Sequence, residues 1–387
     1  MHSFYKMKDK SLHILHIIPN LNMGGAEKFV CDLSNQLANQ KNRISLIIFY
    51  DLDKHNFLLN SLNSKINVVT LSKKKGFDVS LIFRLRKEIS ILKPDLIHSH
   101  LRAFNYLVFS IFFKNIKVVH TVHNLAQEEI NNRIEGLFRK ICFILFNIYP
   151  VTISNQSNRS FHDYYDSNFI HSKLIFNGRS MPEKSSNYSI VENQFKKIKS
   201  KYGSDVKILV NIGRIENQKN HLLLNDVMLS LEKKGFNIIV LVIGGKRGNI
   251  SKSIMNKIYE SGNDRLLFLG EINYPTDYLF LSDYFILSSK YEGMPISLIE
   301  SFACKCMPIS TPVGGIPEMI SDDGFVSKSL SLDDFENSIL KALNVSEKEK
   351  QIILKNNFKK FELFYSISST GKNYYNYYKK IADIKNV

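Results

Sequence analysis

The sequence predicts an α/β protein of two doubly wound domains that face a central cleft. Three observations support this fold class. The chain has 387 residues, more than the roughly 250 to 300 at which a single hydrophobic core stops growing. Short β-branched runs alternate with longer amphipathic runs, as parallel strands alternate with helices. The alternation stops in the polar stretch 180–193 and then restarts, which indicates a linker between two domains.

Each expected element follows from its local pattern. In the first half, apolar residues at helical spacing predict helices at 25–39 and 79–91, and β-branched runs predict strands at 14–18, 43–49, 67–71, 96–99, 117–121 and 151–154. In the second half the same reasoning predicts helices at 221–234, 250–261 and 296–304 and strands at 206–212, 237–243, 266–269, 284–287 and 307–311. We therefore expect domains at 1–185 and 186–365, with a helix in 366–387 that packs back on the first domain.

Composition narrows the class of protein. With 44% apolar and 23% charged residues, disorder, collagen and coiled coil are excluded. Four cysteines are too few for a disulfide scaffold, which favours a reducing compartment. The longest apolar runs, 103–113 and 141–151, are about half of the roughly 20 residues that a bilayer span needs. The apolar run 13–18 ends at Pro19 without a cleavage site, so we expect neither a membrane span nor a signal peptide.

The net charge of +16 and the pI near 9.4 predict an anionic partner: nucleic acid, acidic lipid or a phosphate-bearing substrate. The excess is concentrated in residues 1–190, which hold 25 Lys and Arg against 14 Asp and Glu, a net charge of +11.

In open α/β sheets ligands bind beyond the carboxyl ends of the strands. After the first strand, Gly24 and Gly25 lead into a helix, where glycines allow close approach of a ligand and the helix start attracts phosphate. The alternative is a turn that only starts the helix, and the GxGxxG fingerprint is not met.

Histidines follow the next strands. His98 and His100 share one strand face and could converge with His123. The nearest carboxylate, Asp95, falls on the opposite face from His98, which disfavours a metal site. His98 and His120 are better explained by hydrogen bonds to backbone groups inside the domain, whereas the position of His123 favours a role facing a ligand.

In the second half, Arg214 and Lys219 follow the strand 206–212. A guanidinium and an ammonium at a strand end would suit a diphosphate, although basic residues there are often only a solvated rim. Glu292 and Glu300 flank a helix start near Pro295. The first N–H groups of this helix could bind an anion, and the carboxylates on either side could accept hydrogen bonds from hydroxyls. A sugar nucleotide has this composition, because its diphosphate lies between groups that carry hydroxyls.

Taken together, these residues resemble the motifs of a known protein family. The Glu292 to Glu300 spacing, the Gly213-Arg214 to Lys219 segment, Gly24-Gly25-Ala26-Glu27, Asn177-Gly178 and Gly314-Gly315-Ile316-Pro317-Glu318 resemble the retaining GT-B glycosyltransferases of family 4, of the bacterial surface-polysaccharide type. The match extends from residue 14 to about residue 320.

The resemblance implies a hexosyltransferase that needs no metal and no cofactor, with a nucleoside-diphosphate sugar, expected to be a UDP-sugar, as donor. Arg214 and Lys219 would hold the diphosphate and stabilise the leaving group, and Glu300 would accept from the ribose hydroxyls. Glu292 and His123 would contact the transferred sugar. The remaining donor contacts would come from Gly24, Gly25, Gly293, Met294 and Pro295.

At two places the sequence departs from the family pattern, which weakens the roles that the resemblance implies there. The family usually has a small apolar residue and then Asp after Asn-Gly, whereas this chain has Arg179 and Ser180. The loop 244–249 is more basic than usual, which could suit a charged sugar or be a solvated loop.

The acceptor is expected to be a saccharide or a polyprenyl-linked saccharide. Cations mixed with apolar residues at 73–75, 84–87 and 138–146 predict peripheral attachment to the inner, cytoplasmic face of an anionic membrane; an ordinary basic surface is the alternative. A sugar-nucleotide epimerase of the same fold is a second possibility. A basic nucleic-acid-binding protein is a third, but without recognition motifs we expect no nucleic-acid partner.

Overall fold

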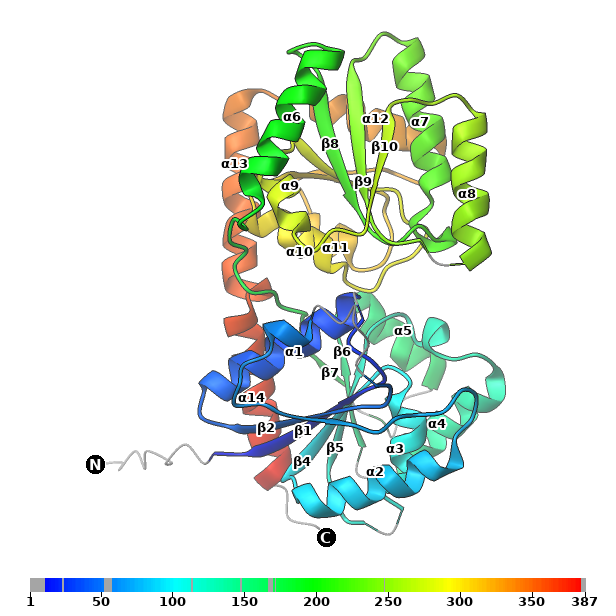
Figure 1. Cartoon of the computed structure of the whole chain (residues 1–387), viewed down its shortest axis with the longest axis vertical. Helices are drawn as coiled ribbons and strands as arrows, with labels where there is room; N and C mark the ends of the chain where they lie inside the picture. The colour runs from blue at the N-terminus through cyan, green and yellow to red at the C-terminus, as the bar shows by residue number, and fades with distance from the viewer. Residues whose placement is uncertain are drawn as a thin grey trace, which may run out of the picture. The chain divides into compact units, whose positions relative to one another are not determined.

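The computed structural model describes residues 11–22, 24–51, 58–112, 114–146, 148–165, 170, 172–246 and 248–383. The chain divides into two compact units (Figure 1). Unit 1 contains residues 1–175 and 370–387, and unit 2 contains residues 176–369. The predicted α/β class with two doubly wound units is confirmed, and each unit is described by itself below.

Unit 1 contains a seven-stranded parallel sheet in the order β3-β2-β1-β4-β5-β6-β7. Its strands are β1 (His13–Ile18), β2 (Arg43–Ile48), β3 (Asn67–Thr70), β4 (Leu96–His100), β5 (Val118–Val122), β6 (Ile148–Thr152) and β7 (Lys173–Leu174). Its helices are α1 (Gly25–Asn39), α2 (Val79–Leu92), α3 (Ala103–Ser110), α4 (Arg133–Leu145) and α5 (Asn155–Tyr165), with short η1 (Leu59–Ser61) and η2 (Ala126–Glu129).

Helices cover both faces of this sheet (Figure 1). Apolar side chains of α2, α3, α4 and α5 form one continuous core with one face. On the other face, Phe29 of α1 packs against Tyr374 of α14 (Ile367–Asp383) at 5.9 Å between ring centroids. The Tyr374 hydroxyl lies 2.9 Å from Thr121 Oγ1, and the Tyr378 hydroxyl lies 2.6 Å from Nδ1 of His98. The C-terminal helix is therefore part of the packing of unit 1.

Unit 2 contains a six-stranded parallel sheet in the order β10-β9-β8-β11-β12-β13. Its strands are β8 (Lys207–Ile212), β9 (Ile238–Ile243), β10 (Leu266–Gly270), β11 (Tyr284–Leu287), β12 (Met307–Ser310) and β13 (Phe325–Val326). Its helices are α6 (Tyr188–Tyr202), α7 (His221–Lys233), α8 (Gly248–Glu260), α9 (Pro275–Leu281), α10 (Ile296–Ala303), α11 (Ile316–Ile320), α12 (Leu332–Leu343) and α13 (Glu347–Lys360), with short η3 (Asn217–Lys219) and η4 (Phe361–Tyr365).

Several elements were not assigned from the sequence: strands β7 and β13 and helices α3, α4, α5, α6, α9, α11, α12 and α13. Two of the differences have a clear physical reason. The polar stretch 180–193 is not all linker, because α6 begins at Tyr188 and buries Val191, Phe195 and Ile198 on one side of an otherwise polar helix. Strand β6 begins at Ile148 and so contains Pro150. The strand tolerates this proline because β7 pairs only with Val151 and Thr152, so Pro150 has no ladder partner among the described residues on that side.

The structure places the divisions between the units after residues 175 and 369, compared with the expected 185 and 365. Among the described residues, no helix is both long enough and apolar enough to span a bilayer.

Candidate active site

The strand order in each sheet reverses at one point, and the candidate residues follow strands at or next to that point. In unit 1 the reversal lies between β1 and β4, and in unit 2 between β8 and β11. Doubly wound sheets bind ligands beyond the carboxyl ends of the strands at such switch points. Gly24 and Gly25 follow β1 and His123 follows β5, while the segments 213–220 and 288–295 follow β8 and β11.

In unit 2 the two loops at the switch point are fastened to each other. The Lys290 N–H donates to the carbonyl of Gln218 at 2.7 Å. The Gln218 side chain donates to the carbonyl of Tyr291 at 3.0 Å, and the Ser288 hydroxyl donates to the carbonyl of Lys219 at 2.8 Å. A backbone carbonyl accepts each of these hydrogen bonds, and one donor is also a backbone group. The two loops are therefore joined by more than flexible side chains.

Lys219 and Glu292 form an ion pair across these loops. The Lys219 ammonium lies 2.5 Å from Oε1 of Glu292, which also accepts the hydroxyl of Ser289 at 2.7 Å. Both charged side chains are largely buried, with 14% and 7% exposure. A Cβ on Gly213 would lie 2.9 Å from Cε of Lys219, so the glycine makes room for the lysine stem.

Gly314 supports the same loop from β12. Its φ is +63°, and a Cβ there would collide with the Glu292 carbonyl. The Gly315 N–H donates to the carbonyl of Gly293 at 2.9 Å. Close backbone contact and a positive φ therefore require the glycine at Gly314, which gives a structural reason for this part of the motif.

Glu300 lies inside α10 and is paired with Arg179. The Arg179 Nε and its terminal nitrogen lie 3.0 and 2.8 Å from Oε1 of Glu300, and both side chains are buried. Arg179 is itself fixed, because its N–H donates to the carbonyl of Tyr365 and its carbonyl accepts from Ile367. The residue that departs from the family pattern thus contacts one of the two motif carboxylates.

The remaining unit 2 candidates lie nearby in sequence but differ in burial. Arg214 is 41% exposed and lies 3.4 Å from Glu216, an ion pair that water largely screens. Gly293 and Met294 lead to Pro295, which precedes α10 as its N-cap, and no side chain of the described part of the chain caps that helix. The first N–H groups of α10 are consequently not used by a capping side chain.

In unit 1, Gly24 caps α1 and Gly25 begins it, as expected. A Cβ on Gly24 would collide with the carboxylate of Glu27. The preceding Met23 lies outside the described residues.

The convergence of His98, His100 and His123 is confirmed. Nδ1 of His100 lies 3.1 Å from Nε2 of His123, and the ring centroids of His98 and His100 are 4.0 Å apart. His120 lies near the Ser99 carbonyl, as expected. His98 does not bond backbone groups, contrary to expectation, because the Thr121 and Tyr378 hydroxyls occupy its two ring nitrogens.

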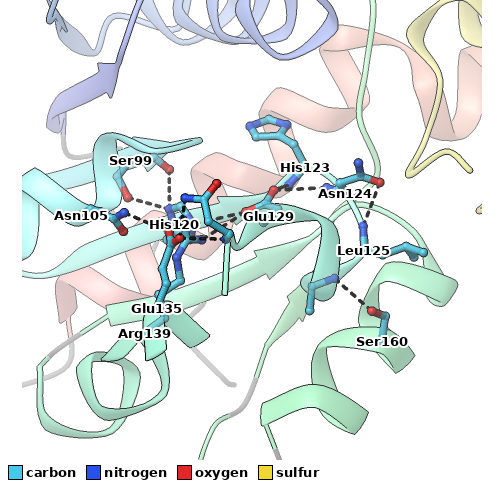
Figure 2. Close-up of polar contacts among 12 residues, drawn as sticks. Ser99, Asn105, His120, His123, Asn124, Leu125, Glu129, Glu135, Arg139 and Ser160 are labelled. Carbon is cyan, nitrogen blue, oxygen red and sulfur yellow. Dashed lines mark hydrogen bonds and ion pairs between the residues drawn. The ribbon is translucent and has the colours of Figure 1, made fainter. Parts of the chain in front are cut away.

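Glu129 holds the loop that carries His123 (Figure 2). Its Oε1 accepts from the backbone N–H of His123 at 2.5 Å and of Asn124 at 3.2 Å. Burial raises the pKa of Glu129, and the buried Arg139 guanidinium, 3.5 Å from Oε2, opposes that rise. Figure 2 shows this carboxylate between the His123 loop and Arg139.

His16, His98 and His100 form the group whose ring nitrogens could be considered for a metal, since they lie within 4.8 Å of one another. Hydroxyls already engage both nitrogens of His98. We therefore describe these rings as a hydrogen-bonded histidine cluster.

The sequence predicted the positions of Glu292, Glu300 and Lys219, but it did not predict that Lys219 pairs with Glu292 or that Ser289 and Arg179 contact the two carboxylates. Ser289 is adjacent to the motif, and Arg179 was noted only as a departure. A buried arginine requires a carboxylate, but the burial of Arg179 is evident only in the structure. His16 and Glu129 gave no signal in the sequence.

Two doubly wound units in one chain are the architecture of the GT-B class. Two family profiles match the chain: "Glycosyltransferase Family 4" over residues 23–178 and "Glycosyl transferases group 1" over residues 192–360. The chain is a glycosyltransferase with the GT-B fold.

Named relatives agree with this assignment. The chain is 27% identical over 322 residues to the capsular polysaccharide biosynthesis glycosyltransferase CapH of Staphylococcus aureus, which covers 78% of this chain and 82% of the relative. It is 24% identical to a Campylobacter jejuni α-1,4-N-acetyl-D-galactosaminyltransferase whose name specifies an undecaprenol-diphosphate saccharide, over 81% of this chain and 83% of the relative. Anabaena Alr3699/HepE, solved in complex with UDP and glucose, shares the fold with a TM-score of 0.79 at 15% identity, over 95% of this chain and 99% of that structure.

Proposed function

We propose that this protein is a retaining glycosyltransferase that moves a hexose from a nucleoside-diphosphate sugar to a saccharide acceptor. The acceptor is a polyprenyl-linked saccharide, and the product belongs to a bacterial surface polysaccharide such as O-antigen, capsule or exopolysaccharide. A UDP-sugar is the proposed donor, which the UDP complex of the HepE structure supports. Unit 2 binds this donor, and unit 1 binds the acceptor.

The observation that carries the proposal is the Lys219–Glu292 pair at the switch point of unit 2. A nucleoside diphosphate leaves as an anion, so the protein has to stabilise negative charge more than it has to supply a proton. A lysine held by backbone contacts offers that charge at a fixed position. When the diphosphate binds, Lys219 exchanges its Glu292 partner for phosphate oxygens, and Glu292 becomes available to the sugar hydroxyls.

Retention of the anomeric configuration follows if the acceptor hydroxyl attacks on the face from which the diphosphate departs. Arg214 and Lys219 stabilise the departing charge, which is the part that a divalent metal plays in other transferases. We therefore propose a metal-independent reaction, to be tested by adding EDTA to the assay and by determining the anomeric configuration of the product by NMR.

The test of the reaction uses purified protein, a panel of nucleotide sugars and a bacterial membrane lipid extract. We expect nucleoside-diphosphate release from one donor, with the rate increased by the extract. Conversion of a nucleotide sugar to its isomer without transfer would instead identify an epimerase. Failure to release nucleoside diphosphate from any donor would overturn the proposal.

An exposed apolar row on α4 supports attachment to the cytoplasmic face of a membrane. Ile134, Leu137, Ile141, Ile144 and Leu145 recur at helical spacing and are exposed, from 44% at Ile141 to 80% at Ile134. The opposite side of α4 packs on the sheet through Cys142 and Phe143. An amphipathic helix of this kind binds a bilayer through its apolar face together with nearby cations.

Helices α2 and α3 lie near α4 in unit 1 (Figure 1) and also carry exposed apolar residues. Phe109 of α3 is exposed and stacks on Phe138 of α4 with centroids 5.4 Å apart. Phe83 of α2 is 67% exposed, and the basic residues Lys87 of α2 and Arg133, the first residue of α4, are exposed as well. The net charge of +11 in residues 1–190 favours an anionic bilayer as the occupant.

Arg139 was expected on this surface and is not part of it. Its side chain is 2% exposed and lies between the carboxylates of Glu129 and Glu135. A buried guanidinium needs such acidic partners, so this residue serves the interior of unit 1.

Sedimentation with vesicles tests the attachment. We expect binding to phosphatidylglycerol vesicles at low salt and little binding to phosphatidylcholine vesicles. Leu137→Glu and Leu145→Glu should each weaken binding by about tenfold, since burying a leucine contributes about 1.5 to 3 kcal/mol. Ile352→Glu, at an exposed position of α13 in unit 2, is the matched control. Equal binding by all variants would contradict the proposed surface.

A further inference from the structure

Three histidine rings form a hydrogen-bonded chain across neighbouring strands of unit 1. Nδ1 of His16 in β1 lies 3.2 Å from Nε2 of His100 in β4. Nδ1 of His100 lies 3.1 Å from Nε2 of His123, which follows β5. Strands β1, β4 and β5 are adjacent in the sheet. The chain thus runs from the fully buried His16 to the partly exposed His123.

The neighbouring rings do not belong to this chain. His98 stacks near His100, but its two nitrogens are engaged by the hydroxyls of Thr121 and Tyr378. His120 lies beside the Ser99 hydroxyl, on the side of Glu129 and Arg139. His100 therefore has one hydrogen-bonding ring neighbour on each side.

All three rings of the chain are neutral at physiological pH. Burial lowers the pKa of His16 and of His123 to about 3, and it lowers the pKa of His100 well below the ordinary value. A neutral imidazole carries one proton on its two ring nitrogens, so one nitrogen donates a hydrogen bond and the other accepts one.

This pairing links the tautomers of the three rings. Each hydrogen bond joins Nδ1 of one ring to Nε2 of the next. If His100 donates from Nδ1, its Nε2 must accept from His16, and Nε2 of His123 must accept from His100. The three rings are therefore either all protonated on Nδ1 or all protonated on Nε2.

The buried end of the chain selects between the two arrangements. Nε2 of His16 is buried, and it has no hydrogen-bond partner among the described residues. Protonation on Nε2 would leave an unpaired N–H in the core, whereas protonation on Nδ1 leaves an unpaired acceptor. Buried donors without partners are rarer than buried acceptors with unused capacity, which favours the Nδ1–H form.

We propose that His16 and His100 are positioning residues that hold His123 in the Nδ1–H tautomer, so that His123 presents a hydrogen-bond donor to its ligand. The acceptor on the ligand is a hydroxyl oxygen, and under the proposed function it belongs to the transferred sugar. Only the identity of that ligand rests on the proposed function. The tautomer is a property of the free protein.

The test is a long-range ¹H–¹⁵N NMR spectrum of the unliganded protein labelled with ¹⁵N-histidine. We expect His16, His100 and His123 all to show a protonated Nδ1 and an unprotonated Nε2. An Nε2–H tautomer on His123, or mixed tautomers among the three rings, would overturn the proposal. Because no substrate is present, the outcome is independent of transferase activity.

Variants at His100 separate tautomer control from simple packing. The amide nitrogen of an asparagine can replace Nδ1 as the donor, so His100→Asn should keep the Nδ1–H form of His123. His100→Leu removes that donor and should give a substantial Nε2–H population on His123, with kcat lowered at least about tenfold. His13→Leu is the matched control, since His13 is a buried histidine of β1 that contacts Ser45. Unchanged His123 tautomers in His100→Leu would contradict the positioning role.

Discussion

The two carboxylates of the unit 2 site are each matched with a cation from another segment. Glu292 is paired with Lys219, and Glu300 is paired with Arg179. Removing one partner of a buried ion pair leaves an uncompensated charge and typically costs about 3 to 5 kcal/mol. A loss of activity in such a variant therefore needs a control in which a similar pair is broken elsewhere.

Lys219→Ala and Glu292→Ala should each lower turnover at least about tenfold while the protein stays folded, because oriented charge at the reacting centre is lost. Lys234→Ala is the control, since Lys234 follows α7 and pairs with the buried Glu336 of α12, away from the carboxyl ends of the strands. Steady-state kinetics and circular dichroism measure both effects. If both site variants kept the wild-type rate, the site would be assigned wrongly.

Arg179 is expected to act through Glu300, which is the predicted ribose acceptor. Arg179→Lys keeps the charge but loses the guanidinium fork, so the carboxylate is held less firmly. We expect the donor KM to rise about tenfold with a smaller change in kcat. Arg265→Lys, which alters the Arg265–Glu232 pair, is the control. An unchanged donor KM would show that Arg179 has only a structural role.

At the scale of elements, the loop after β8 depends on a close approach of two glycines. A Cβ on Gly244 would collide with the carbonyl oxygen of Gly213, which precedes Arg214. Gly244→Ala should therefore shift this loop, lower the free energy of unfolding by about 1 to 3 kcal/mol and lower kcat. Urea denaturation and steady-state assays provide the measurements.

Gly245→Ala is the matched control for this substitution. A Cβ on Gly245 would meet only the flexible carboxylate end of Glu271, at 3.2 Å. We expect a small change in stability and in rate. Equal effects of the two alanines would mean that the glycine contact does not support the site.

Local pattern predicted the strands that are buried on both faces, such as β1, β8 and β9, because continuous apolar runs define them. The two-residue edge strands β7 and β13 were not predictable, since so few residues carry no periodicity. The helix α6 was missed because its buried positions are spaced within a polar sequence.

The candidate site likewise contains residues that the sequence predicts and contacts that it does not predict. Glu292, Glu300 and Lys219 follow from short spacings and strand ends. The contact between Arg179 and Glu300 joins residues 121 positions apart, and the contact between His16 and His100 joins residues 84 positions apart. Strand order brings His16 of β1 beside His100 of β4, and the packing of the segment around residue 179 against α10 brings Arg179 to Glu300. A single sequence states neither arrangement.

At the scale of the whole molecule, the chain passes between its units twice, after residues 175 and 369. Helix α14 completes unit 1 by placing Tyr374 and Tyr378 beside Thr121 and His98. The buried histidines lie mainly in unit 1, whereas unit 2 contains a single histidine, His221.

This asymmetry predicts that acid destabilises unit 1 before unit 2. Burial strongly lowers the folded-state pKa of five unit 1 histidines below the ordinary value of 6.5: His16, His98, His100, His120 and His123. It also lowers the pKa of a sixth, His13. Below pH 6.5 the unfolded state binds protons that the folded state does not. Stability is therefore fully present above that pH and declines as the pH falls towards the folded pKa values, by about 1 kcal/mol for each histidine between pH 7 and 5.5.

Hydrogen exchange between pH 7 and 5.5, analysed peptide by peptide, measures the two units separately. After correction for intrinsic exchange, we expect the opening free energy of β1, β4 and β5 to fall by several kcal/mol. Strands β8 and β9 should change by about 1 kcal/mol, because only His221, whose pKa burial lowers to about 4, contributes in unit 2. Glu129 acts in the opposite direction, since burial raises its pKa, but it is one group against five. Equal losses in both units would mean that burial does not keep the histidine cluster neutral, and that the tautomers of its rings are not linked.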